Sequence, residues 1–374
     1  MSNNLKYLFH LLAFPFLYIK YRILILFDIN KSRDDYLECS TLIISHDLGG
    51  GTAKYLDSFR TKDAVIIKNI EYIWHICYKV EIADQHFYIT DNKMKKIISK
   101  EYNEIIINSF VKMRQIFSLM PLFINIKKMH PHIKLLYLVH DYHAVCPNFN
   151  LIRNNTYCGL ICQNCNYIQP IVFGSKKKVD IIEWRKQWET FLENCDEILC
   201  FSNSSKNIIC SVYPLITDKV IVKPHEVLPI PGKYILNDNI VYKVGFFGTI
   251  NNGAKGLYQT REILSQIDNN INVCFVGSKA EEIGIKRNNI QYLGRYSHNQ
   301  LIDIINTNNI SLAVFPSVVP ETFSFLVSEL IMIGIPILGF DIGAQGEKIK
   351  EYSKGTVFDS WEEMVKFING QFEK

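Results

Sequence analysis

The sequence predicts an α/β protein built of two doubly wound domains, each with a parallel sheet. Its 374 residues exceed one compact domain and correspond to two or three, at roughly 150 residues per domain. Short β-rich apolar runs recur without polar alternation, and longer mixed stretches separate them. Such runs are typical of strands buried on both faces, and their alternation with helix-length segments predicts βαβ units.

The apolar runs fall into two sets, separated by the segment 224–234, which contains three prolines and a glycine and is a candidate linker. The predicted strands are 41–45, 64–68, 104–108, 135–139 and 197–201 in the first set, and 244–247, 272–276, 311–315 and 336–340 in the second. We therefore expect an N-terminal domain over residues 41–228 and a C-terminal domain over residues 229–374, with a ligand cleft between them.

The composition excludes several classes of protein. Hydrophobic residues make up 48% of the chain and charged residues 21%, so the chain can bury a full core and is not disordered. The net charge of +4 is too small to indicate nucleic-acid binding. Residues 1–226 carry 28 basic and 22 acidic residues, or +6, and residues 227–374 carry 13 and 15, or −2. The basic first half fits an anionic membrane surface as a partner, with solvated basic faces as the alternative.

The N-terminal segment 1–40 is apolar and basic. Its apolar stretch 7–19 is interrupted by Pro15 and followed by Lys20 and Arg22. A spanning helix needs about 20 apolar residues, so the segment either crosses the membrane, lies in its interface or packs on the domain. No small-residue cleavage site follows the apolar stretch, so we expect a reduced, cytosolic chain, peripheral at the inner face of the cytoplasmic membrane.

Two strand ends of the predicted N-terminal domain carry residues suited to ligand binding. Strand 41–45 runs into Gly49, Gly50 and Gly51, which let the backbone approach a ligand and turn amide groups toward an anion. A plain strand–helix turn explains one glycine more readily than three. Strand 135–139 ends at His140, which could hydrogen-bond a sugar or a phosphate. The alternative is a structural histidine.

Two strand ends of the predicted C-terminal domain carry charged residues. The loop after strand 244–247 contains glycines and Lys255, and could hold a diphosphate although it lacks the P-loop pattern. The loop after strand 311–315 contains Glu321, and the next helix contains Glu329. Glu321 could hold a polar ring and Glu329 two vicinal hydroxyls, whereas the alternative is two solvated glutamates.

Four cysteines cluster in the loop 146–165 of the predicted N-terminal domain. Cys146, Cys158, Cys162 and Cys165 have the spacing C-x11-C-x3-C-x2-C. Four thiols in a reduced chain can hold zinc tetrahedrally, and the final pair has ligand spacing. The sequence therefore predicts a possible structural zinc site, with four reduced loop cysteines as the alternative.

The motifs at these strand ends resemble those of a known family. PETFSFLVSE (320–329) resembles the E-x7-E signature of retaining GT-B glycosyltransferases of the large family 4 group. VHDYHAVCP (139–147) looks like bacterial enzymes that build cell-surface polysaccharides such as the lipopolysaccharide O-antigen. The resemblance covers roughly residues 41–350. Its other motifs, in the same order, are the glycine loop 49–51, CFSNSS (200–205), GTINNGAKG (248–256) and GFDIGAQGE (339–347).

The resemblance implies transfer of a sugar from a nucleotide-sugar, bound by the C-terminal domain, to a glycan or lipid-linked glycan bound by the N-terminal domain. Glu321 and His140 would contact the transferred sugar, and Glu329 would hold the ribose hydroxyls. The implied donor-binding residues are Lys255, Glu329, Gly50, Gly51, Thr322, Phe323, Ser324 and Phe325. Amide groups and Lys255 would stabilise the departing diphosphate. No D-x-D motif is required, so we expect no cofactor for catalysis.

One position departs from the family. Relatives often carry an arginine six residues before the phosphate lysine, and this chain has Thr249 there. Threonine cannot supply the cation, and Arg295 and Lys279 are possible substitutes. Two alternative functions stay open: a GT-B epimerase or phosphorylase, and a non-catalytic partner of another transferase.

Overall fold

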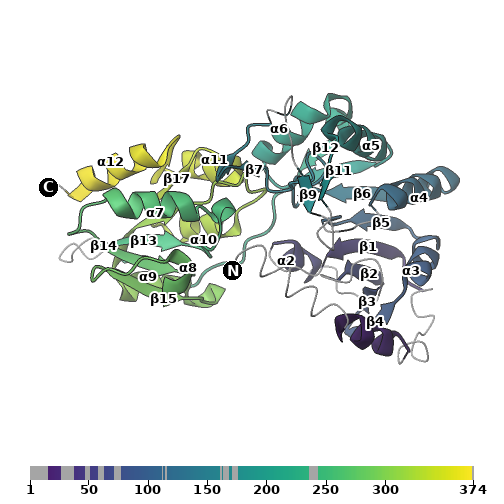
Figure 1. Cartoon of the computed structure of the whole chain (residues 1–374), viewed down its shortest axis with the longest axis horizontal. Helices are drawn as coiled ribbons and strands as arrows, with labels where there is room; N and C mark the ends of the chain where they lie inside the picture. Colours follow the sequence, from purple (N-terminus) through teal and green to yellow (C-terminus); the bar gives the residue numbers. More distant parts are fainter. Residues whose placement is uncertain are drawn as a thin grey trace. The chain divides into compact units, whose positions relative to one another are not determined.

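The structure is a computed structural model of the chain. It describes residues 16–26, 38–46, 51–57, 63–70, 77–111, 113, 116–160, 162, 168–170, 176–235 and 243–372. Contacts divide the chain into two compact units: the first is Met1–Phe149, Ile161–Phe201 and Lys206–Lys223, and the second is Asn150–Leu160, Ser202–Ser205 and Pro224–Lys374. Figure 1 shows the helices and strands in chain order. Each unit has a largely or wholly parallel sheet, so the predicted α/β class is confirmed.

The first unit contains an eight-stranded sheet in the order β12-β11-β6-β5-β1-β2-β3-β4. Its strands are β1 (Thr41–His46), β2 (Ala64–Asn69), β3 (Tyr78–Ile82), β4 (Gln85–Ile89), β5 (Glu104–Ile107), β6 (Lys134–Leu138), β11 (Glu197–Cys200) and β12 (Val220–Val222). Neighbours from β12 to β2 pair in parallel, whereas β3 and β4 form an antiparallel hairpin beside β2. The five strands expected in this unit are all present.

Five labelled helices lie before residue 213 in the described parts of the chain. They are α2 (Gly51–Asp57), α3 (Asp91–Ile98), α4 (Ile116–Met129), α5 (Ile181–Glu193) and α6 (Asn203–Val212). Asp180 caps α5, because its Oδ1 accepts the Ile182 amide at 2.9 Å. Trp184 and Trp188 lie on the buried face of α5 and pack in the core.

Residues 16–26 form a further helix. One side of it, with Leu17, Tyr21 and Ile25, packs against Ile70, Cys77 and Tyr88. The rings of Tyr21 and Tyr88 meet edge to face, with centroids 5.3 Å apart. None of the helices in the described parts of the chain is long and apolar enough to cross a membrane. The rest of the predicted apolar stretch, residues 7–15, lies outside the described residues.

The second unit contains a six-stranded parallel sheet in the order β15-β14-β13-β16-β17-β18. The strands are β13 (Lys243–Phe247), β14 (Asn272–Val276), β15 (Ile290–Gly294), β16 (Ile310–Phe315), β17 (Ile337–Phe340) and β18 (Gly355–Phe358). Counted from β13, the order is 3-2-1-4-5-6, the doubly wound arrangement that binds ligands where the strand order reverses. That switch point lies between β13 and β16.

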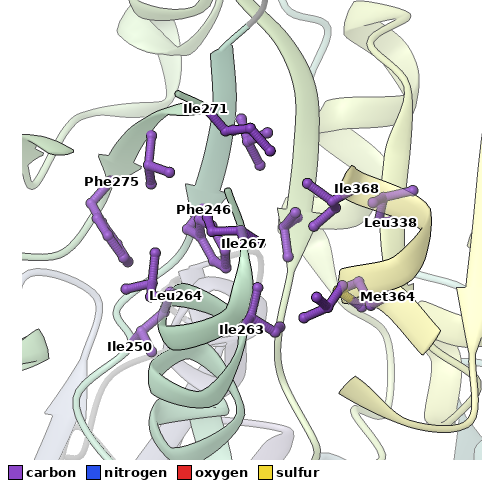
Figure 2. Close-up of a cluster of buried hydrophobic side chains, with 14 of the residues drawn as sticks. Phe246, Ile250, Ile263, Leu264, Ile267, Ile271, Phe275, Leu338, Met364 and Ile368 are labelled. Carbon is purple, nitrogen blue, oxygen red and sulfur yellow. The ribbon is translucent and has the colours of Figure 1, made fainter. Parts of the chain in front are cut away.

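Helices cover both faces of this sheet. They are α7 (Leu257–Gln266), α8 (Ala280–Ile283), α9 (Leu301–Thr307), α10 (Phe325–Ile333), α11 (Gly343–Glu351) and α12 (Trp361–Phe372). In Figure 2, Phe246 and Phe275 of the sheet meet Ile263 of α7 and Met364 and Ile368 of α12 in one core. Phe247, one residue after Phe246, belongs to a second core with α9 and α10. Successive strand residues therefore face two cores, which explains the unbroken apolar runs.

Short elements complete the described chain. They are the hairpin of β7 (Ile152–Arg153) and β8 (Thr156–Tyr157), the pair β9 (Ile168–Pro170) and β10 (Lys176–Lys178), and the 3-10 helices η3 (Pro214–Lys219), η4 (Gly253–Lys255) and η5 (His298–Gln300). The β7–β8 hairpin belongs to the second unit, where Gln259 Nε2 of α7 donates to the Asn155 carbonyl at 2.7 Å. In the candidate linker, Ile230 and Tyr234 pack against the second unit, and the boundary at residue 228 stays a prediction.

Candidate active site

The candidate site lies where the loops after β13 and β16 meet. The Val318 amide in the β16 loop donates to the Ala254 carbonyl in the β13 loop at 3.3 Å. Gly256, at the end of the β13 loop, has a φ of +76° and lies against the backbone of Pro316. Because both loops leave the carboxyl ends of adjacent parallel strands, they form the switch-point edge where such sheets bind ligands.

Lys255 and Glu321 form an ion pair at this edge. Lys255 Nζ lies 2.7 Å from Glu321 Oε1, and the Glu321 side chain is 15% exposed while that of Lys255 is 45% exposed. Burial by itself would raise the pKa of Glu321, but the Lys255 ammonium outweighs it and holds that pKa below its usual value. Glu321 in turn raises the pKa of Lys255. Both groups are therefore charged at neutral pH.

The backbone of Glu321 is fixed on both sides. Its amide donates to Oε1 of the buried Gln345 at 3.0 Å, and its carbonyl accepts the Ala344 amide at 2.9 Å. Gln345 Nε2 also donates to the Val319 carbonyl at 2.6 Å. The loop that carries Glu321 is thus anchored on the first turn of α11, which holds the carboxylate in place.

The segment Thr322 to Phe325 leads from Glu321 into α10. Ser324, the residue before the helix, has a φ of +61°, a left-handed conformation that costs energy for a residue with a Cβ. The amide groups in the first turn of a helix have no partner within that helix and carry a partial positive charge. The positive end of α10 therefore lies beside the loop that carries the Lys255–Glu321 pair.

Glu329 is buried in α10 and contacts His298, which lies in η5 after β15. Glu329 Oε1 is 3.0 Å from His298 Nδ1. Burial, with a contribution from the Glu329 charge, raises the pKa of Tyr296 well above its usual value. His298 was not predicted from sequence, because its pairing with Glu329 depends on how η5 packs against α10.

Thr249 follows β13, where relatives of the family often have an arginine. The two substitutes considered from sequence, Lys279 and Arg295, follow β14 and β15 and are both exposed. Neither forms an ion pair with any residue that the structure describes. No described contact ties either residue to Lys255 or Glu321, so their role as phosphate cations stays a prediction.

The histidine and glycine motifs of the first unit are placed in part. The His140 ring, just after β6, stacks on Phe201 at a centroid distance of 4.5 Å and meets Tyr55 at 5.1 Å. Gly51 is the first residue of α2, whereas Gly50 lies outside the described residues. The neighbouring Asp141 is structural, since it accepts the Ser109 hydroxyl at 2.7 Å and the His143 amide at 2.8 Å.

The predicted zinc ligands are described only in part. Cys146 is buried, Cys158 and Cys162 are half-buried, and Cys165 lies outside the described residues. Arg185 Nη2 donates to Cys162 Sγ at 3.1 Å, an interaction that also suits a thiolate. Within the described ranges, no three His, Cys, Asp or Glu residues are grouped to hold a metal. Because Cys165 lies outside the described residues and was not covered by this finding, the zinc site stays a prediction.

Comparison with known proteins agrees with this geometry. Residues 235–369 match the family described as Glycosyl transferases group 1. The chain is similar in structure to Anabaena Alr3699/HepE in complex with UDP (TM-score 0.55, 12% identity, 89% of this chain and 90% of that chain). It is also similar to the lipopolysaccharide outer core galactosyltransferase WaaB in its apo form (TM-score 0.54, 11% identity, 88% and 89%). No curated protein matches the chain.

These similarities define the class of the protein. The structural likeness extends over both units and shows the GT-B fold. The matched segment contains the whole second sheet, with Lys255, Glu321 and Glu329. The predicted enzyme class, a glycosyltransferase, is therefore confirmed at the level of this domain, while membership of family 4 stays a prediction.

Proposed function

We propose that the protein is a retaining glycosyltransferase that moves a sugar from a nucleotide-sugar to a growing, lipid-linked glycan. The proposal is carried by the Lys255–Glu321 ion pair at the switch point of a group 1 glycosyltransferase domain. A further HepE structure, solved with UDP-glucose (TM-score 0.53, 14% identity, 89% of this chain and 90% of that chain), supports a nucleotide-sugar as donor.

The chemistry of donor cleavage fits the charges at this edge. When the bond between the sugar and the diphosphate breaks, negative charge develops on the departing phosphate oxygen. The Lys255 ammonium and the backbone amides of Thr322 to Phe325 are fixed positive groups that favour this charge. We propose that Glu329, which contacts His298, accepts hydrogen bonds from the two vicinal hydroxyls of the ribose.

Glu321 acts as a charge and not as a proton donor. Its lowered pKa keeps it ionised at neutral pH, so it is poorly suited to general acid catalysis. We propose that Glu321 contacts the transferred sugar. The acceptor hydroxyl then attacks the sugar on the same face from which the diphosphate departs. A bond from the acceptor oxygen to the sugar forms as the sugar–phosphate bond breaks, and the hydroxyl proton passes to the departing phosphate. His140, Gly50 and Gly51 are proposed to contact the sugar and phosphates.

The donor site can be tested by ligand-dependent stability. Among UDP, GDP, ADP, CDP and TDP, we expect one nucleotide to stabilise the wild type by about 2.7 kcal/mol when its free concentration is 100 times its Kd. The Glu329→Ala variant should lose most of this shift, because it loses the ribose contact. Glu351→Ala, which removes an exposed carboxylate from α11, is the control and should behave as wild type. A folded wild type that no nucleotide stabilises would contradict the proposal.

We also propose that helix 16–26 docks the enzyme on an anionic membrane, which gives access to a lipid-linked acceptor. The side of this helix opposite its packed face exposes Phe16, Ile19, Ile23 and Leu26 at 77%, 55%, 46% and 65%. Lys20 and Arg22 lie on either flank of this apolar stripe, given 3.6 residues per turn. An apolar face flanked by basic residues is typical of helices that lie in the interface of anionic bilayers.

Vesicle binding tests this docking. The wild type should sediment with vesicles of phosphatidylcholine and phosphatidylglycerol, and less with phosphatidylcholine alone. The double variant Ile19→Glu/Ile23→Glu should bind at least about 10-fold more weakly, since charges replace the apolar contacts. Ile182→Glu, at a more exposed apolar position on α5, should have no effect. Equal binding by the double variant and the wild type would show that another surface docks.

A further inference from the structure

Lys348 on α11 lies over an aromatic cluster at the start of α10. Its Nζ is 3.3 Å from the centroid of the Phe323 ring. The Phe323 ring meets the rings of Phe325 and His225 edge to face, at 4.8 Å and 4.9 Å, and His225 stacks on Phe325 at 5.2 Å. We call Phe323, Phe325 and His225 the aromatic cluster. The contact with this cluster places the Lys348 ammonium beside the backbone segment that leads from Glu321 into α10.

Lys348 forms no ion pair with a carboxylate in the described parts of the chain. Its hydrogen bond goes to a neutral group, the Ser328 hydroxyl, at 2.6 Å. Within the described residues, no carboxylate oxygen lies within 4.0 Å of its Nζ, whereas Lys255 pairs with Glu321 and Lys350 pairs with Asp341. A partly buried cation without a counter-charge is costly, and an arriving anion removes that cost.

The neighbouring groups leave this charge in place. Burial lowers the pKa of Lys348 to about 8, while Glu321 and Glu347 act in the opposite direction, so the amine is protonated at neutral pH. Burial, together with the charge of Lys348, lowers the pKa of His225 to about 4, so this ring is neutral. Lys348 is therefore the cation of the cluster. Its hydrogen-bond partner and the ring beneath it are neutral, and its flexible side chain can turn toward an anion.

We propose that Lys348 supplies the second cation for the donor diphosphate, in place of the arginine that is absent at Thr249. This inference rests on the proposed function, since it assigns a further ligand contact in the same donor site. Phe323 and Phe325, which hold the ammonium, belong to the backbone segment that offers its amides to the phosphates. A diphosphate bound there would lie between Lys255, on the β13 loop, and Lys348, on α11.

Binding of UDP, inorganic diphosphate and uridine by titration calorimetry tests the assignment. UDP is used because HepE was solved with it. If the ligand-dependent stability test selects GDP, ADP, CDP or TDP instead, that nucleotide and its nucleoside replace UDP and uridine. Lys348→Met should weaken the nucleoside diphosphate and inorganic diphosphate by at least about 10-fold and leave the nucleoside, which has no phosphate, unchanged. Lys348→Arg should restore most of the affinity. Lys350→Met removes an exposed cation of the same helix and should behave as wild type.

The outcomes separate this inference from the function on which it rests. If Lys255→Met weakens diphosphate binding and Lys348→Met does not, Lys348 is not the second cation, although the donor site stands. If Lys348→Met weakens the nucleoside and the diphosphate equally, Lys348 has only a structural role. If the wild type binds none of the five nucleoside diphosphates, both the donor site and the role of Lys348 are wrong.

Discussion

Replacing Glu321 by Gln should lower kcat for sugar transfer by about 10²–10³, a loss typical of removing one preorganised electrostatic contact to the transition state. The glutamine side chain keeps the shape of glutamate, and the backbone amide of residue 321 can keep its hydrogen bond to Gln345, but the charge that pairs with Lys255 at 2.7 Å is lost. Lys255 can then bind the phosphates without competition from the Glu321 carboxylate. We therefore expect the affinity for the nucleoside diphosphate to stay the same or to increase while catalysis falls.

The measurement is release of nucleoside diphosphate from a nucleotide-sugar in the presence of acceptor, with affinity followed in parallel by calorimetry. Glu351→Gln makes the same chemical change at an exposed position on α11 and should retain full activity. Parallel losses of affinity and kcat would mean that Glu321 contributes to ground-state binding. Intact biological function in Glu321→Gln, with no release of nucleoside diphosphate by the variant or the wild type, would favour the non-catalytic partner.

Replacing Gly256 by Ala should lower the free energy of unfolding by about 2–5 kcal/mol. The φ of +76° costs about 1–2 kcal/mol for a residue with a side chain. In addition, the new Cβ would overlap the carbonyl oxygen of Pro316 and force the β13 and β16 loops apart. Since Lys255 and Glu321 lie on these two loops, the variant should also lose donor affinity.

A matched substitution separates the two causes. Gly334, at the end of α10, has a φ of +89°, but no atom lies within 4 Å of the position its Cβ would take. Gly334→Ala should therefore cost only the backbone strain, about 1–2 kcal/mol, and leave donor affinity unchanged. Chemical denaturation of both variants gives the comparison. Equal losses of stability would show that the contact with Pro316 relaxes freely.

The central strands could be predicted from sequence because both of their faces are buried. Each of the nine apolar runs corresponds to a strand, including TLIIS within Thr41–His46 and NVCFV at Asn272–Val276. Strands toward the sheet edges were missed. β15 (IQYLG) and β18 (GTVF) are only partly buried along their length, so their residues form no continuous apolar run. The β3–β4 hairpin was not predicted, for the same reason.

The site could be predicted in part. Glu321, Lys255 and Glu329 follow strands whose carboxyl ends share one edge, so the strand pattern and the motifs together locate them. His298 and Lys348 could not be found in this way, because each reaches the site through the packing of a helix against α10. The substitutes suggested for the missing arginine, Lys279 and Arg295, had no spacing argument behind them, and their role stays a prediction.

We propose that the second unit binds a nucleotide-sugar and cleaves it. Release of nucleoside diphosphate from a panel of nucleotide-sugars, added to wild-type enzyme with a lipid-linked glycan fraction, tests it most directly. We predict release from one nucleotide-sugar, matched by appearance of the sugar on the acceptor and nearly absent in Glu321→Gln. Folded enzyme that binds a nucleoside diphosphate but transfers no sugar from any donor, with or without acceptor, would contradict the account.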